Sequence, residues 1–265
     1  MAREFLEFAS ELAMEAGGLL GDYMGQKLTV SKKGRINLVT EADLKSEELL
    51  VSRIFERFPH HSILAEEGGA RQLREKASEF RWIIDPLDGT TNFAHRYPFF
   101  CVSIALEIAG QLEIGVVYDP TARELFTAVR GEGAQLGGHP IQVSSEVSLR
   151  DSLVCTGFAY NREEILKNLE LFHEFMLKAR AVRRDGSAAL DLCYVAAGRF
   201  EGFWELSLNP WDVAAGALIV AEAGGRVSRF DGSPARLDIP EIVATNGSIH
   251  EQMLAIIQEG LEKQS

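Results

Sequence analysis

Cysteine is scarce in this chain. Three occur among the 265 residues, at positions 101, 155 and 193. They are far apart, odd in number and set in apolar surroundings, which argues against a disulfide framework and against a CxxC metal site. A reducing compartment, the cytoplasm, is therefore the simplest expectation.

Long apolar runs are missing as well. A membrane helix needs roughly 18 to 20 apolar residues, whereas the run from Cys101 to Leu106 meets Glu107 at once. The opening segment carries Glu4 and Glu7 among its apolar residues, unlike the basic start and unbroken apolar stretch of a signal peptide. We expect no membrane partner, and we interpret the opening segment as the first helix of the fold.

Basic residues are outnumbered, with 27 Lys and Arg against 39 Asp and Glu and a net charge of -12. This balance argues against direct binding to nucleic acid. The content of 46% hydrophobic and 25% charged residues is typical of a globular protein that buries a large core. The length allows one large domain or two packed lobes, and we expect two lobes, residues 1–147 and 148–265. Because no internal repeat or low-complexity linker occurs, the boundary between them is expected to be a lobe junction and not a flexible tether.

Hydrophobic spacing predicts helices and strands in a mixed order, typical of an α/β (α+β) fold. Helices are expected at 5–20, 40–58, 162–179, 188–197, 210–223 and 248–262. Strands are expected at 62–65, 81–85, 99–108, 112–118 and 125–129, and near residues 153, 182, 226 and 242.

The segment WIIDPLDGTTNF, Trp82 to Phe93, carries the most chemical information. Pro86 fixes its own backbone and Gly89 permits a positive φ, so this segment can aim Asp85 and Asp88 at one point. Two such carboxylates repel unless a cation lies between them, and hard oxygen ligands suit Mg²⁺ together with a phosphate. The alternative is that the two acids only cap turns, since Asp-Pro and Asp-Gly are ordinary turn dipeptides.

Two further acidic elements match this segment in character. Glu66 and Glu67 follow a predicted strand in AEEGG, and Asp212 follows Asn209 and Pro210 at the start of a predicted helix. A helix start also favours an acid for electrostatic reasons alone, which is compatible with metal binding. Three acidic strand or helix ends suggest that these side chains converge.

Taken together, these motifs resemble the inositol monophosphatase family, part of the Mg²⁺-dependent, Li⁺-sensitive phosphatases. The resemblance covers essentially the whole chain and rests on four ordered motifs: LVTEAD (38–43), AEEGG (65–69), WIIDPLDGTTNFAHRYPF (82–99) and NPWDVAAGALIVAEAGG (209–225). It implies a layered α/β/α/β/α sandwich of the inositol monophosphatase and fructose-1,6-bisphosphatase type, and commonly a homodimer.

Carried over to this sequence, the resemblance implies two or three Mg²⁺ ions, with Mn²⁺ as a substitute and Li⁺ as an inhibitor. One ion would be bound by Glu67, Asp85, the Leu87 carbonyl and the Thr90 hydroxyl. A second would be bound by Asp85, Asp88 and Asp212, and a third, weaker ion would lie near Glu67. Glu66 is assigned to local structure or to support of the ligands.

The physical interpretation agrees, because four carboxylates holding up to three divalent cations give a net positive site that accepts a phosphate dianion. Water on the ion beside Glu67 would become the nucleophile, and the second ion would stabilise the leaving alkoxide.

Thr40 and Asp43 have the pattern of a capping box. The resemblance gives Asp43 a second role, in which it hydrogen-bonds Thr90 and the pair helps to activate water.

Substrate contacts rest on the resemblance alone. It implies that the substrate touches Asp88, Gly89, Thr90, Gly186, Ser187, Ala188, Glu205 and Asp212. A carboxylate at Glu205 suits a neutral polyol, although Arg183 or Arg184 could offset its charge. Lys32 and Lys33 lie in the early loop that often closes over the metals in this family.

The sequence therefore predicts a cytoplasmic phosphomonoesterase that hydrolyses inositol monophosphate or a similar small polyol phosphate. The enzymatic alternative is a fructose-1,6-bisphosphatase or a dual phosphatase. The alternative from another class is a regulatory protein that binds the transcription machinery, since a bacterial member of the family does so independently of hydrolysis.

Overall fold

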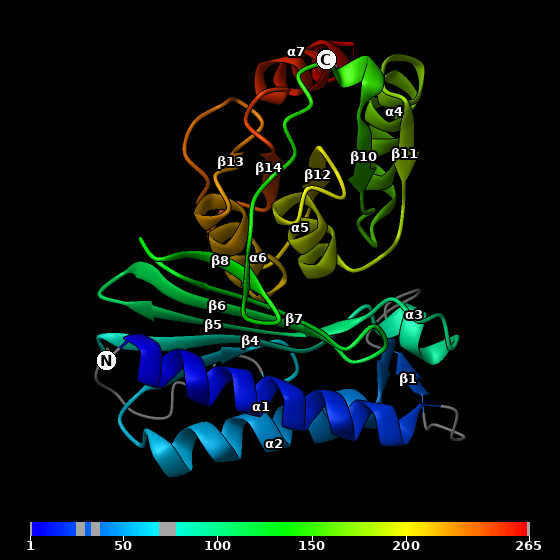
Figure 1. Cartoon of the computed structure of the whole chain (residues 1–265). Coiled ribbons are helices and arrows are strands. Elements are labelled where there is room, and N and C mark those ends of the chain that lie inside the picture. Colours follow the sequence, from blue (N-terminus) through cyan, green and yellow to red (C-terminus); the bar gives the residue numbers. More distant parts are fainter. Residues whose placement is uncertain (1, 25–29, 33–37, 69–77, 264–265) are drawn as a thin grey trace.

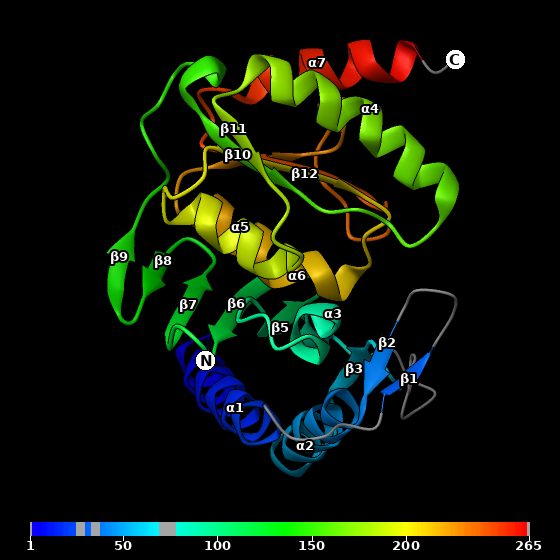
Figure 2. The same cartoon turned by 90° about the vertical axis from the view of Figure 1, so that its right-hand side faces the viewer.

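The structure, a computed structural model, describes residues 2–24, 30–32, 38–68 and 78–263. Its elements stack in five layers (Figures 1 and 2). From one side to the other these are helices α1 (Ala2–Tyr23) and α2 (Glu41–Arg57), a large sheet, helices α5 (Ala188–Ala196) and α6 (Pro210–Glu222), a smaller sheet, and helices α4 (Arg162–Lys178) and α7 (His250–Glu262). The predicted α/β/α/β/α sandwich is confirmed.

Within the described residues, the large sheet has the strand order β3-β4-β5-β6-β7-β8-β9. Strands β3 and β4 are parallel, and the other neighbours are antiparallel. The strand bounds are β3 Ser62–Ala65, β4 Phe80–Asp88, β5 Cys101–Ile108, β6 Gln111–Asp119, β7 Glu124–Val129, β8 Gly133–Leu136 and β9 His139–Ile141.

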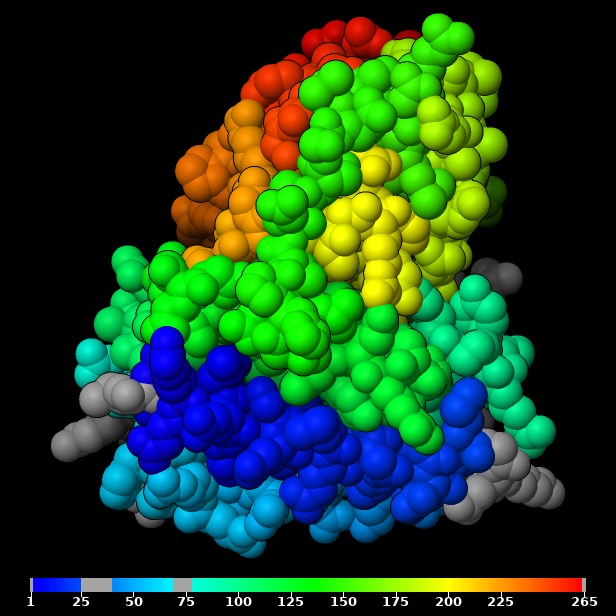
Figure 3. Space-filling view, viewed as in Figure 1, coloured from blue at the N-terminus to red at the C-terminus, as the bar shows by residue number. Residues whose placement is uncertain are grey.

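The smaller sheet has the order β11-β10-β12-β14-β13 over the described part of the chain, with β10 parallel to both of its neighbours. Its strands are β10 Leu153–Thr156, β11 Ala181–Arg183, β12 Gly202–Leu206, β13 Arg226–Ser228 and β14 Glu241–Thr245. A separate antiparallel pair, β1 (Val30–Lys32) and β2 (Leu38–Thr40), precedes α2. In the space-filling view, the first half of the chain forms the lower part of the molecule and the second half the upper part (Figure 3).

Helix α6 lies tightly on the large sheet because a glycine makes room for it. A Cβ on Gly115 of β6 would lie 2.8 Å from the Ala215 carbonyl oxygen of α6. The apolar faces of α5 and α6 are buried between the two sheets and join residues of both in one core. This close packing fixes the start of α6, and therefore Asp212, relative to the large sheet.

Several elements differ from the sequence-based expectation. Strand β4 does not end at Asp85 but continues through Pro86 to Asp88, and β5 begins at Cys101, two residues after the expected start. Strand β12 was not expected, because its short run, GFWEL, mixes glycine and a carboxylate with apolar residues; nevertheless it is central in the smaller sheet. A short helix, α3 (Thr90–Ala94), and the strands β8 and β9 were not expected either.

No helix in the described part of the chain is both long and apolar enough to cross a membrane.

Candidate active site

A β-bulge in β4 places Asp85 and Asp88 on the same face of the large sheet. Asp85 pairs with Ser103 of β5 and Asp88 pairs with Cys101, so Pro86 and Leu87 together stand opposite one residue. In a regular strand, residues three apart point to opposite faces, and the extra residue of a bulge restores a common direction. Ser46 of α2 donates to the Pro86 carbonyl at 2.8 Å and holds the bulge from the other side.

Asp88 reaches from the sheet to the start of helix α5. Its Oδ2 accepts hydrogen bonds from the Ser187 hydroxyl at 2.7 Å and from the Ala189 backbone N–H at 2.8 Å. Ser187 is the residue that caps α5. The hydroxyl of Ser187, expected to contact substrate, is thus used to position Asp88, while Gly186 takes the positive φ of 93° that this turn requires.

Asp212 enters the same region from the first turn of α6. Its Oδ2 accepts a hydrogen bond from the Asn209 backbone N–H at 2.6 Å, as in a capping box, and Pro210 is the first helical residue. Asp212 therefore stands at a helix start, as the sequence predicted. The same helix start carries Asp212 to the cleft that Asp85 and Asp88 line.

The structure brings Glu66, and not Glu67, to these aspartates. Along β3, Ile63 and Ala65 face the α1–α2 core, whereas Leu64 packs on the core around α5 and α6. Continuing that alternation, Glu66 lines the cleft with Asp85, and Glu67 lies with Ile63 and Ala65 against α2. The backbone N–H of Glu67 is held by Glu47 Oε2 at 2.7 Å.

Asp43 makes the hydrogen bonds of both alternatives that the sequence left open, the capping box and the contact with Thr90. It forms the capping box of α2 with Thr40, whose backbone N–H donates to Asp43 Oδ2 at 2.8 Å. The Thr90 hydroxyl donates to Asp43 Oδ1 at 2.8 Å and lies 3.2 Å from the Leu87 carbonyl oxygen. Asp43 is fully buried, so burial raises the pKa of its carboxyl despite these hydrogen bonds.

A cleft of about 340 Å³ is lined by Glu66, Asp85, Asp88 and Asp212. The cleft contains nearly all of the residues expected at the site: Asp85, Leu87, Asp88, Gly89, Thr90, Gly186, Ser187, Ala188, Glu205 and Asp212. Among the expected residues, Glu67 and Asp43 do not line it. Lys33 lies outside the described residues, as does the side chain of Lys32.

Tyr160 and Arg184 are among the cleft side chains that sequence reasoning did not assign to the site. Tyr160 follows β10 in a segment without a motif, so no pattern pointed to it. Arg184 was considered only as a nearby charge, yet it lines the same cleft as Glu205. Its positive charge counteracts the burial that raises the pKa of Glu205 to about 8.

Several carboxyl groups with raised pKa values lie together in the cleft, where Arg184 is the cation among the described lining residues. Burial raises the pKa of Asp88 to about 6, and burial together with the charge of Asp88 raises that of Asp212 to about 8. Burial also raises the pKa of Asp85, and Glu66, Asp88 and Asp212 add to this effect in that order. Among the described residues, no positive charge is a leading influence on these three aspartates, so protons or metal cations must neutralise them.

The donor set fits hard divalent cations. It offers carboxylate oxygens from several elements, the Leu87 carbonyl and the Thr90 hydroxyl, which are oxygen ligands of the kind that Mg²⁺ binds. Among the described residues, no three acids of the cleft have ligand atoms that all lie within 4.8 Å of one another, whereas two glutamates and one histidine of α4 do. That spread suits Mg²⁺, which typically takes one or two carboxylates and completes its shell with water and phosphate.

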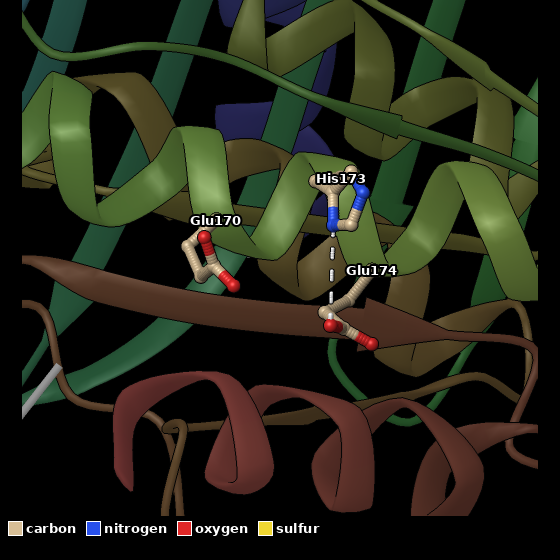
Figure 4. A group of neighbouring side chains, drawn as sticks. All are labelled: Glu170, His173 and Glu174. Carbon is tan, nitrogen blue, oxygen red and sulfur yellow. Dashed lines mark ion pairs between the residues drawn. The ribbon is translucent and has the colours of Figure 1, made fainter. Parts of the chain in front are cut away.

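The compact acidic group on α4 consists of Glu170, His173 and Glu174 (Figure 4). Here positive charges are already in place. Lys263 and Lys178 lie 2.6 Å and 3.3 Å from the two carboxylate oxygens of Glu174. Hydrogen bonds from these lysines lower the pKa of Glu174, so this carboxylate stays charged without a metal. We therefore place the functional site in the cleft.

Comparisons with known proteins agree with this geometry. A family model described as the inositol monophosphatase family matches residues 1–262. The chain is 49% identical over 251 residues to an inositol-1-monophosphatase of Synechocystis sp., covering 94% of this chain and 87% of that protein. It is 45% identical over 237 residues to the Nus factor SuhB of Pseudomonas aeruginosa, covering 88% of each chain.

Solved structures agree as well. The fold superimposes on that of an IMPase from Thermotoga maritima with a TM-score of 0.91 and 35% identity, covering 99% of this chain and 100% of the other. The family resemblance expected from the four motifs is thereby confirmed. The chain belongs to the inositol monophosphatase family and is a phosphatase.

Proposed function

We propose that the chain hydrolyses inositol monophosphate, or a similar small polyol phosphate, with the help of Mg²⁺. The observation that carries this proposal is the cleft lined by Asp85, Asp88, Asp212 and Glu66, in which burial and the other three acids raise the pKa of Asp85. Such a group attracts divalent cations, and the loaded site attracts a phosphate dianion. The name of the Synechocystis relative, inositol-1-monophosphatase, supports the choice of substrate.

The proposed ligand set replaces Glu67 by Glu66. One ion would be held by Glu66, Asp85, the Leu87 carbonyl and the Thr90 hydroxyl. A second would be held by Asp85, Asp88 and Asp212. Glu66 is preferred because it lines the cleft, whereas Glu67 lies in the groove along α2.

When bound, the metal ions would lower the pKa of water and stabilise negative charge on the oxygens of the transferring phosphate. The chain itself provides the proton path. Because Thr90 Oγ donates its proton to Asp43 Oδ1, its lone pairs are directed away from Asp43 and can accept a proton from water. Asp43 is suited to receive that proton, since burial raises the pKa of its carboxyl.

At the other end of the cleft, Glu205 and the turn of Gly186 to Ala188 are proposed to contact the hydroxyl groups of the substrate. Arg184 lines the same cleft and supports the alternative substrate, fructose 1,6-bisphosphate, because its guanidinium group can pair with the second phosphate of that substrate. Phosphate release from inositol 1-phosphate and fructose 1,6-bisphosphate, measured side by side with Mg²⁺ titrated, decides between them. Preference for the bisphosphate would overturn the polyol proposal.

The same assay defines the cofactor. We expect activity to require Mg²⁺, to be partly supported by Mn²⁺ and to be inhibited by Li⁺. Activity that survives complete removal of divalent cations by a chelator would contradict the metal proposal.

We further propose that the protein is a homodimer with lobes formed by residues 1–147 and 148–265. The support for a dimer is an exposed apolar stripe on α4, formed by Leu166, Leu169, Met176 and Leu177. Exposed apolar stripes of this kind favour helix-to-helix contact. Light scattering should give a dimer mass for the wild-type protein and a monomer mass for Leu169→Glu; a monomeric wild-type protein would refute the dimer.

The buried free thiols support a cytoplasmic location.

A second role in transcription is supported by the relative named Nus factor SuhB. If such a role exists here, the chain should copurify with RNA polymerase, and Asp88→Asn should abolish turnover while leaving this association unchanged. If the chain does not copurify with RNA polymerase, the proposed role in transcription is refuted and the phosphatase function is unaffected.

A further inference from the structure

The carboxyl group of Glu205 lies directly against the bare backbone of Gly157. A Cβ built on Gly157 would lie 2.1 Å from both carboxylate oxygens of Glu205. Gly157 follows β10, whose last residue, Thr156, pairs with Trp204 of the parallel strand β12, so residues 157 and 205 are neighbours across the sheet. The position of this carboxyl therefore depends on the absence of a side chain at residue 157.

A buried hydrogen-bond network fixes these two strand ends. Asn168 of α4 donates from Nδ2 to the Gly157 carbonyl at 2.5 Å and to Thr156 Oγ1 at 3.1 Å. Its Oδ1 accepts from Trp204 Nε1 at 2.8 Å, and Thr156 Oγ1 donates to the Trp204 carbonyl at 2.6 Å. Thr156, Asn168 and Trp204 are each at most 1% exposed. A buried network in which each of these groups has a partner is rigid.

The backbone conformation at residue 157 does not require glycine. Its φ lies outside the left-handed region, in contrast to Gly89 at 97° and Gly186 at 93°, which any side chain would strain. An alanine at 157 would therefore fit the backbone, and the three atoms nearest to its Cβ all belong to the Glu205 carboxyl group. The neighbouring strands leave Glu205, which is 8% exposed, little room to move except into the cleft.

We propose that Gly157 is a specificity-determining residue and that Asn168 is a positioning residue. Together they set the position at which the Glu205 carboxyl meets the hydroxyl groups of the substrate. This inference rests on the proposed function, in which Glu205 contacts a polyol. It assigns the end of β10 and the buried face of α4 to substrate selection, although neither carries a motif residue.

The test is a double-mutant cycle with Gly157→Ala, Glu205→Ala and the double variant, assayed at saturating Mg²⁺ on inositol 1-phosphate and p-nitrophenyl phosphate. Gly157→Ala should raise KM for inositol 1-phosphate by about 10-fold or more, with a much smaller change for p-nitrophenyl phosphate, which has no polyol hydroxyls. In the Glu205→Ala background, the same alanine should add less than about 2-fold, because no carboxylate remains to be displaced. Gly18→Ala, where a Cβ meets nothing within 4 Å, is the matched control.

Equal losses on both substrates, or a full effect of Gly157→Ala without Glu205, would overturn the inference. If the wild-type protein does not turn over inositol 1-phosphate, the proposed function fails, and thermal unfolding still tests the contact itself. Gly157→Ala should then lower the Tm, and adding Glu205→Ala should restore it. A Tm that falls further in the double variant would show that the residues act independently.

Discussion

The molecule carries two groups of acidic side chains that differ in what neutralises them. On α4, Glu174 lies between Lys178 and Lys263, and these lysines lower the pKa of its carboxyl. In the cleft, Asp85 is buried and Asp88 and Asp212 are half-buried, and the pKa values of all three are raised. The more compact group, on α4, is thus neutralised by lysines. The more widely spaced group, in the cleft, is the one that we expect to bind cations. Charge balance, rather than proximity of acids, distinguishes the proposed functional site from an ion-pair network.

The largest expected effect comes from removing a charge in the cleft. Asp88→Asn should lower kcat/KM by at least about 1,000-fold, because a bound metal contributes several kcal/mol to the transition state and each 1.36 kcal/mol is tenfold in rate. Phosphate release at saturating Mg²⁺ measures it, with circular dichroism to show that the variant is folded. Near-normal turnover by a folded Asp88→Asn protein would refute the proposed site.

The next effect is stabilisation by metal. A ligand at about 100 times its Kd that binds only the folded state adds about 2.7 kcal/mol, which corresponds to a rise in Tm of about 5–10 °C for a chain of this size. Mg²⁺ should therefore raise the Tm of the wild-type protein and of Glu174→Gln, but much less that of Asp212→Asn. An equal rise in all three proteins would place the metal elsewhere.

A third effect is the pH dependence of the metal-free protein. The folded-state pKa values of Asp212 and Glu205, each about 8, lie above those of the unfolded chain, so their contribution to stability is present at low pH and lost as pH rises through 8. In a chelator, Tm should fall between pH 6.5 and 8.5 by at least about 2–4 °C.

This pH window avoids His250, whose pKa is lowered to about 4 by burial and whose contribution to stability is lost only as pH falls below the unfolded value of 6.5. Asp212→Asn is the matched variant and should flatten the profile. A Tm that rises over this range in the wild-type protein would contradict the assigned burial of charge.

The smallest effect is expected on α4. Glu174→Gln should change kcat/KM by less than about 2-fold and lower the Tm only slightly, since the two lysines that pair with Glu174 are exposed and such ion pairs contribute little. It is assayed beside Asp88→Asn under identical conditions. A large loss of activity, or a loss of response to Mg²⁺, would remove the distinction between the two acidic groups.

Much of the fold followed from periodicity. The helices α1, α2, α4, α5, α6 and α7 and most strands lie where apolar spacing and turn residues predicted them, because a half-buried element must repeat its apolar residues with its own period. Strand β12 escaped prediction because it is buried on both sides in the centre of a sheet, where no alternation is needed and a carboxylate, Glu205, is tolerated at the cleft.

Of the candidate site, the residue types were predictable and the directions of two side chains were not. The bulge at Pro86 and Leu87 is a property of the pairing between β4 and β5, so the common face of Asp85 and Asp88 emerges only in the sheet. The choice between Glu66 and Glu67 depended on which face of β3 meets α2. The alternation from Ile63 onward showed that Glu66 and Glu67 point to opposite faces of the sheet. Only the packing of the neighbouring helices showed which of these faces meets α2 and which meets α5 and α6.

The sequence by itself therefore determined the chemistry: the carboxylates, the threonine beside them, the glycine and proline that bend the chain between them, and the helices and strands that carry them. The tertiary structure alone decided which acids meet, which lysines neutralise Glu174, and why the Glu205 carboxyl rests on Gly157. The physical reason is that periodicity and turn chemistry are local, whereas the charge balance and burial of a side chain depend on elements that are distant in the sequence.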